Sequence, residues 1–138
     1  MLSNQCSEPR VALVVGASAG IGMATAEGLL RQGFRVILGC RNASRGQLAL
    51  AALQKTTGQV AELLTLDLES LDSLQRAVEE LHRRCDRLDV LVHNAGVVYP
   101  QRRTTAEGWE AQLAVIYLSP FWLTQQLEGG GSSGYRAG

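Results

Sequence analysis

The sequence predicts an α/β domain built on a doubly wound parallel sheet of about four strands. Short apolar segments alternate with segments of helical periodicity along most of the chain, and glycine or polar residues separate them. With 138 residues, 46% of them hydrophobic, the chain is large enough for one domain with its own core. We place this domain at residues 10–127, between an N-terminal tail at residues 1–9 and a flexible Gly/Ser-rich tail at residues 128–138.

A glycine-rich turn separates the first expected strand, residues 10–15, from the first expected helix, residues 20–32. Gly33 is expected to end this helix, because glycine adopts the left-handed conformation common at helix C-termini. The second strand is expected at residues 35–40. The buried positions expected in the helix include Ala24, Leu29 and Leu30.

Capping residues delimit the next helices. Asn42 or Ser44 caps a second helix, which ends at the break formed by residues 56–58 and carries Leu48, Ala51 and Ala52. A third strand follows at residues 61–66, and Ser70 is a natural N-cap for a third helix. Apolar residues recur in that helix every three or four positions and predict a stripe that faces the core: Leu71, Leu74, Val78 and Leu81.

The last expected elements are a strand at residues 88–93 and, after a polar loop, an apolar helix at about residues 105–126. Pro120 lies four residues after Ile116 and has no N–H to donate to its carbonyl. We therefore expect the last helix to bend at this point.

The composition argues against several classes of partner. Lys+Arg and Asp+Glu are equal at 13 each, so no basic field indicates nucleic acid or an acidic membrane surface. The sequence contains no uninterrupted apolar stretch of about 18 residues, the length that would predict a membrane span. We therefore expect a soluble, cytoplasmic chain. The three cysteines lack Cys-x-x-Cys spacing. We expect reduced, non-functional thiols and no metal site.

Gly16, Gly20 and Gly22 follow the first strand with the spacing G-x-x-x-G-x-G and lead into a helix. The backbone N–H groups of such a turn and the positive end of the helix dipole suit a pyrophosphate. A glycine-rich junction can also be only a tight turn. Together with the alternation of strands and helices, the motif favours a Rossmann-like fold that binds a dinucleotide.

The end of the second strand is where such a fold recognises the adenosine ribose. An acidic residue there accepts a hydrogen bond from the 2′-hydroxyl, whereas an arginine accommodates a 2′-phosphate. The residues at this point are Cys40, Arg41 and Asn42, so NADP(H) is favoured over NAD(H). Alternatively, Arg41 is an ordinary solvated charge. Asp67, after the third strand, either touches the adenine or caps the following turn.

These residues resemble the motifs of the short-chain dehydrogenase/reductase family, and the match runs from about residue 10 to residue 126. The three glycines match its glycine motif, Asp67-Leu68 its adenine-side motif, and residues 94–96 its Asn-Asn-Ala-Gly motif. Residues 40–42 and 103–110 are most similar to retinol-dehydrogenase-like members, which are NADP(H)-linked and act on lipophilic carbonyls and alcohols. The resemblance implies that the cofactor is lined by Gly16, Ser18, Gly20, Ile21, Gly22, Arg41, Asp67, Asn94, Ala95 and Gly96.

The chain departs from the family pattern around the glycine loop. Val15 stands where the family usually has Thr, and His93 stands at the first Asn of the Asn-Asn-Ala-Gly motif. These changes put in question the hydrogen bonds that tie the loop to the fourth strand. We expect His93 to be packed or partly exposed rather than catalytic, and His82 to lie on the surface.

The family's catalysis requires a Ser, a Tyr and a Lys four residues after the Tyr, with a supporting Asn whose place is taken here by Ile116. The single lysine is Lys55, and the sequence contains no Tyr-x-x-x-Lys. An arginine does not replace this lysine, because its charge is spread over a planar group of different shape. We therefore expect no catalytic residue in the chain.

The favoured interpretation is the NADP(H)-binding part of a short-chain oxidoreductase, C-terminally truncated and catalytically inactive, with NAD(H) a weaker candidate. Truncation would leave the fourth strand as an open edge, which predicts marginal stability, self-association or pairing with a full-length subunit. The alternatives are a non-catalytic binding or regulatory module and a non-functional truncated product. The last helix is expected to lack cover over Leu113, Ile116, Tyr117, Leu118, Phe121, Trp122 and Leu123.

Overall fold

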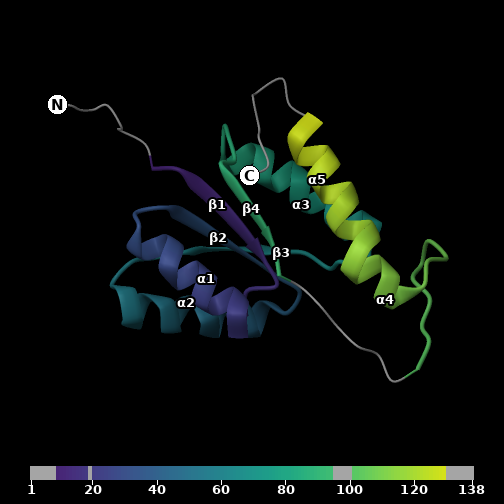
Figure 1. Ribbon diagram of the computed structural model, residues 1–138, viewed down its shortest axis with the longest axis horizontal. Coiled ribbons are helices and arrows are strands. Elements are labelled where there is room, and N and C mark those ends of the chain that lie inside the picture. Colours follow the sequence, from purple (N-terminus) through teal and green to yellow (C-terminus); the bar gives the residue numbers. More distant parts are fainter. Residues whose placement is uncertain (1–8, 19, 95–100, 130–138) are drawn as a thin grey trace.

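Four parallel strands form the sheet in the order β3-β2-β1-β4 in the computed structural model (Figure 1), which describes residues 9–18, 20–94 and 101–129. The parallel sheet predicted from the sequence is confirmed, with β4 at one edge. Three strands are one or two residues shorter than expected. Their bounds are Val11–Val15 for β1, Arg35–Cys40 for β2, Glu62–Thr65 for β3 and Val90–His93 for β4.

Helices cover both faces of the sheet (Figure 1), and this explains why β1 is apolar at every position. On one face α1 (Gly20–Arg31) and α2 (Ala43–Thr57) pack against Ala12 and Val14. On the other face α3 (Leu71–Arg84) and α5 (Ser119–Gly129) pack against Leu13 and Val15. The core is therefore two apolar layers separated by the strands.

The predicted helix boundaries agree closely with the structure in the first three helices. Asn42, and not Ser44, caps α2, because its side chain accepts the N–H of Arg45 at 2.9 Å. The hydroxyl of Ser70 caps α3 in the same way. Gly33, which follows α1, has a φ of 90° that favours glycine.

The predicted buried faces of α1 and α2 are partly wrong. Ala24 is exposed and Leu29 is only half-buried, while Ala26 and Leu30 are buried in α1. In α2, the three apolar residues named from the sequence are all exposed: Leu48, Ala51 and Ala52. The side of α2 that faces the sheet consists of Gly46, Ala49 and Leu53.

The last helical segment begins later than predicted. Residues 104–110 form a turn closed by a bridge between Thr104 and Glu110, and the carboxylate of Glu110 caps the helix that follows. The segment then runs through α4 (Ala111–Leu113), the π-helical η2 (Ala114–Leu118) and α5. At the place where a bend was expected, near Ile116, the backbone forms a π-helical turn, in which the N–H of Ser119 bonds to the carbonyl of Ala114.

The outer side of this segment carries four exposed apolar side chains. We call them the exposed stripe: Leu113, Ile116, Tyr117 and Phe121. The rings of Tyr117 and Phe121 stack with centroids 6.1 Å apart. The expectation of an uncovered helix is right for these four and wrong for Leu123, which is buried, while Leu118 and Trp122 are half-buried.

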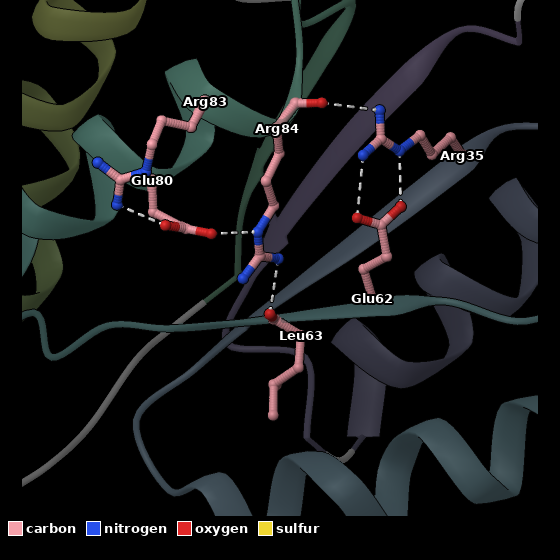
Figure 2. A network of polar contacts seen from close by, with 6 residues as sticks. All are labelled: Arg35, Glu62, Leu63, Glu80, Arg83 and Arg84. Atoms are coloured by element: carbon pink, nitrogen blue, oxygen red, sulfur yellow. Dashed lines mark hydrogen bonds and ion pairs between the residues drawn. The ribbon is translucent and has the colours of Figure 1, made fainter.

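The amino ends of β2 and β3 are joined to the C-terminal turn of α3 by charged side chains (Figure 2). The guanidinium of Arg35 binds both oxygens of Glu62, at 2.6 and 3.0 Å, and also donates to the carbonyl of Arg84. Arg84 in turn donates to the carbonyl of Leu63 at 2.8 Å and pairs with Glu80. This network joins the sheet to α3 at the amino ends of the strands, and the glycine loop lies at their opposite, carboxyl ends.

Two other expectations concern surfaces. His82 is half-buried on α3 rather than fully on the surface. Within the described ranges, the helices are too short or too polar for one of them to cross a membrane.

Candidate functional site

The glycine loop lies at the carboxyl edge of the sheet, where β1 passes into α1. From β1 the chain moves to β2 and β3 on one side, while β4 adds on the other side. The loop is therefore at the topological switch point, the place where open parallel sheets bind ligands. The strand ends around it bring together Arg41 after β2, Asp67 after β3 and Asn94 after β4.

Three glycines shape the loop. Gly16 and Gly20 have φ values of 84° and 63°, a backbone region that L side chains rarely adopt. A Cβ atom on Gly22 would lie 2.5 Å from the carbonyl oxygen of Gly16 and 2.7 Å from the side-chain nitrogen of Asn94. The first turn of α1 can approach the loop this closely only because position 22 has no side chain.

The first turn of α1 faces outward. Ile21 is 75% exposed, and Ser18, in the loop before α1, is half-buried. The N–H groups of a first helical turn have no partner within their own helix, and they point along the axis toward the loop. The arrangement suits an anionic group placed above Gly20.

Asn94 holds the loop from the neighbouring strand end. Its side-chain nitrogen donates to the carbonyl of Gly16 at 3.4 Å, and its backbone N–H donates to the carbonyl of Val15 at 3.0 Å. The departures at Val15 and His93 therefore leave a direct link between β4 and the loop. Ala95 and Gly96, expected beside it, lie outside the described residues.

His93 has a structural partner. Its Nε2 lies 2.8 Å from the hydroxyl oxygen of Thr124 in α5, and that hydroxyl donates to the carbonyl of Pro120. Nε2 is thus the donor to Thr124. Although the residue as a whole is exposed, burial of its ring lowers the pKa of His93, which favours the neutral form. The expectation of a packed, partly exposed histidine agrees with this geometry.

Asp67 caps the turn after β3, which is one of the two roles expected for it. Its Oδ1 accepts the N–H of Glu69 at 2.9 Å, and its own N–H donates to the hydroxyl of Ser73. The carboxylate thus stabilises the turn between β3 and α3, and the side chain stays half-buried at the carboxyl edge.

Arg41 is 63% exposed and pairs with Glu69, whose other oxygen binds Arg103. The sequence identified Arg41 but neither of these partners. Glu69 lies two residues after Asp67, yet nothing in its spacing shows that its side chain turns toward β2. Arg103 lies in a loop, 34 residues after Glu69 in the chain.

The described residues fit the phosphates of a dinucleotide. The fit rests on a loop that admits no side chain at Gly22, on two left-handed glycines, and on an accessible guanidinium at the end of the adjacent strand. They do not form the family's catalytic pair. Lys55 is exposed near the end of α2, whereas Tyr117 belongs to η2 on the other face of the sheet.

Known proteins share this sequence pattern and fold. The family model described as short chain dehydrogenase matches residues 10–129. Retinol dehydrogenase 14 of Mus musculus is 39% identical over 132 residues, which cover 87% of this chain and 39% of that protein. The WW domain-containing oxidoreductase of Drosophila melanogaster is 38% identical and is covered to 30% of its length. The chain therefore spans well under half of these relatives.

A solved structure shows the same arrangement. L-sorbose reductase from Gluconobacter frateurii, complexed with NADPH and L-sorbose, superposes with a TM-score of 0.71 at 26% identity. The match covers 85% of this chain and 45% of the reductase.

Proposed function

Because this chain belongs to the short chain dehydrogenase family, we propose that the carboxyl edge of its sheet binds NADP(H). The observation that carries the proposal is the position of Arg41 beside the loop of Gly16, Gly20 and Gly22, at the switch point of the sheet. The bound NADPH in the similar L-sorbose reductase supports the same cofactor class.

Each proposed contact uses a group already in place. The N–H groups of the first turn of α1 bind the pyrophosphate, and the guanidinium of Arg41 binds the 2′-phosphate. Asn94 keeps the carbonyl of Gly16 turned toward β4, so the loop stays open to the ligand. The dinucleotide supplies a hydride donor or acceptor when bound.

We propose further that the 138-residue chain binds the cofactor without turning it over. A proton donor is needed at the substrate oxygen, and the family's Tyr-x-x-x-Lys is absent from this sequence. Lys55 and Tyr117 lie on opposite faces of the sheet. NADPH oxidation by the purified chain with lipophilic aldehydes tests this, and turnover above the buffer rate contradicts it.

Cofactor binding is tested by fluorescence titration with NADPH and with NADH. We expect NADPH to bind more tightly, and we expect Arg41→Gln to weaken NADPH binding roughly tenfold while leaving NADH unchanged. Lys55→Gln is the matched control, because it removes one exposed positive charge near the far end of α2. Equal affinities for the two cofactors in the unmodified chain would contradict the assignment.

The exposed stripe supports a second candidate function, self-association. Its four apolar side chains lie on one side of the α4–η2–α5 segment. A single helical surface can pair with its own copy about a two-fold axis. The formal net charge is zero, so two copies do not repel each other. We propose a second copy of this chain as the partner, to be measured by sedimentation as described below.

A further inference from the structure

Glu69 brings two arginines from distant parts of the chain to one point beside the end of β2. Its Oε2 lies 3.5 Å from Nη1 of Arg41, and its Oε1 lies 3.1 Å from Nη2 of Arg103. Arg41 directly follows β2, Glu69 precedes α3, and Arg103 precedes α4. Each oxygen of one carboxylate therefore binds a different guanidinium.

The three side chains differ in exposure. Glu69 is only 13% exposed, whereas Arg41 is 63% and Arg103 is 49% exposed. The N–H of Glu69 is also held by the carboxylate of Asp67. The carboxylate is thus fixed within the structure, while both guanidiniums face solvent. Because both guanidiniums are accessible, each can bind a further anion while it stays beside the carboxylate of Glu69.

The charges of this cluster fit a phosphate. Two guanidiniums and one carboxylate leave a single net positive charge beside the end of β2. A phosphate monoester carries nearly two negative charges at neutral pH, and arginine binds it through charge-assisted hydrogen bonds. The guanidinium of Arg41 alone would compensate only part of the phosphate charge. A second guanidinium, that of Arg103, is bound to the same Glu69 carboxylate.

We propose that Arg103 is a second arginine for the 2′-phosphate of NADP(H), and that Glu69 is the positioning residue that places both guanidiniums. This inference rests on the proposed cofactor binding and deepens it by naming two residues outside the expected cofactor-lining set as determinants of cofactor specificity. Because Glu69 is itself negative, it also competes with the phosphate for both arginines. Its charge therefore limits the affinity for NADP(H) and has little effect on NAD(H).

The test compares NADPH and NADH titrations of three single variants with the unmodified chain. We expect Arg103→Gln to weaken NADPH binding about fivefold and to leave NADH unchanged. We expect Glu69→Gln to strengthen NADPH binding about threefold, because it removes the competing charge. Arg102→Gln is the matched control, since Arg102 is exposed and forms no ion pair with the residues that the structure describes.

A second probe isolates the phosphate that is recognised. Adenosine 2′,5′-bisphosphate and 5′-AMP are titrated with the same variants, and circular dichroism establishes that each variant is folded. Weaker binding of the bisphosphate alone to Arg103→Gln is the expected result. Equal weakening of both nucleotides would assign Arg103 to the 5′-phosphate and overturn the inference.

The outcomes separate this inference from the function on which it rests. If Arg41→Gln weakens NADPH binding but Arg103→Gln behaves like Arg102→Gln, the inference is wrong and the proposed cofactor binding stands. If Glu69→Gln weakens NADPH binding, the proposal that the Glu69 carboxylate competes with the 2′-phosphate for the two arginines is wrong. If the unmodified chain binds neither NADPH nor the bisphosphate, both proposals fail.

Discussion

At the residue scale, Gly22 is the position where the loop depends most on the absence of a side chain. A Cβ atom added to Gly22 would lie closer to the carbonyl oxygen of Gly16 and to the side-chain nitrogen of Asn94 than Cβ atoms lie to such groups in proteins. Both of these groups are fixed, Gly16 by its N–H bond to the carbonyl of Gly39 and Asn94 by its bond to Val15. The loop cannot move aside without losing one of these bonds.

Gly22→Ala is therefore expected to lower the free energy of unfolding by about 1–3 kcal/mol and to weaken NADPH binding. Gly28→Ala is the control in the same helix, because a Cβ there meets nothing within 4 Å. That change should raise the free energy of unfolding by about 0.5–1 kcal/mol. Urea unfolding measures both. Equal effects of the two substitutions would show that the close approach at Gly22 is relaxed in solution.

Some residues of the site could be predicted from the sequence and others could not. Glycine spacing and the position of Arg41 after β2 are local patterns, so the sequence alone predicts that these residues lie at the carboxyl ends of β1 and β2. The link between Glu69 and Arg103 joins two loops 34 residues apart, and only the packed sheet brings them together. Asp67 remained ambiguous because both of its possible roles use the same carboxylate.

At the element scale, the Arg35–Glu62 pair joins the amino ends of β2 and β3. Arg35 lowers the pKa of Glu62 below its ordinary value of 4.5, mainly through its hydrogen bond and despite the opposing effect of burial. A lowered carboxyl pKa stabilises the folded state at pH values above 4.5. This stabilisation is lost as the pH falls through the pKa of the folded state.

Glu62→Gln is expected to lower the free energy of unfolding by about 1 kcal/mol near pH 7, and the difference from the unmodified chain should shrink as the pH falls below 4.5. Glu27→Gln, which breaks the exposed pair with Arg31 in α1, is the control and should change stability less. Urea unfolding at several pH values measures both. A difference that persists unchanged in acid would show that the charge on Glu62 contributes nothing.

The order and type of the helices and strands were predictable because glycine, proline and capping residues act locally. The start of the last helix was not, since residues 105–110 have helical composition but Glu110 caps a helix that begins after them. Pro120 predicted a break at the carbonyl of Ile116. It did not predict that residues 114–118 would form a π-helical turn, because a missing N–H does not specify which hydrogen bonds replace the lost one.

At the scale of the whole molecule, one side of the α4–η2–α5 segment buries apolar residues and the other exposes them. Leu123 and Leu127 face α3 and the sheet, and Ser119 is fully buried with its hydroxyl bonded to the carbonyl of Leu68. The exposed stripe lies on the opposite side. The sequence predicted an apolar helix but not which residues would be covered.

We expect the 14.9 kDa chain to sediment above its monomer mass at micromolar concentration and Phe121→Glu to shift it toward monomer, because a charge in the stripe is costly to bury. Leu48→Glu is the control, since Leu48 is also an exposed apolar residue but lies on α2 in the other helical layer. A monodisperse monomer in the unmodified chain would rule out the second candidate function.

The contact between Asn94 and Gly16 also has a consequence for the order in which the molecule is assembled. The two residues are 78 positions apart, whereas β1 can pair with β2 as soon as the next strand along the chain is available. Long loops close more slowly than short ones. The glycine loop is therefore expected to be among the last parts of this fold to acquire its final shape, although β1, from which it starts, can pair with β2 early.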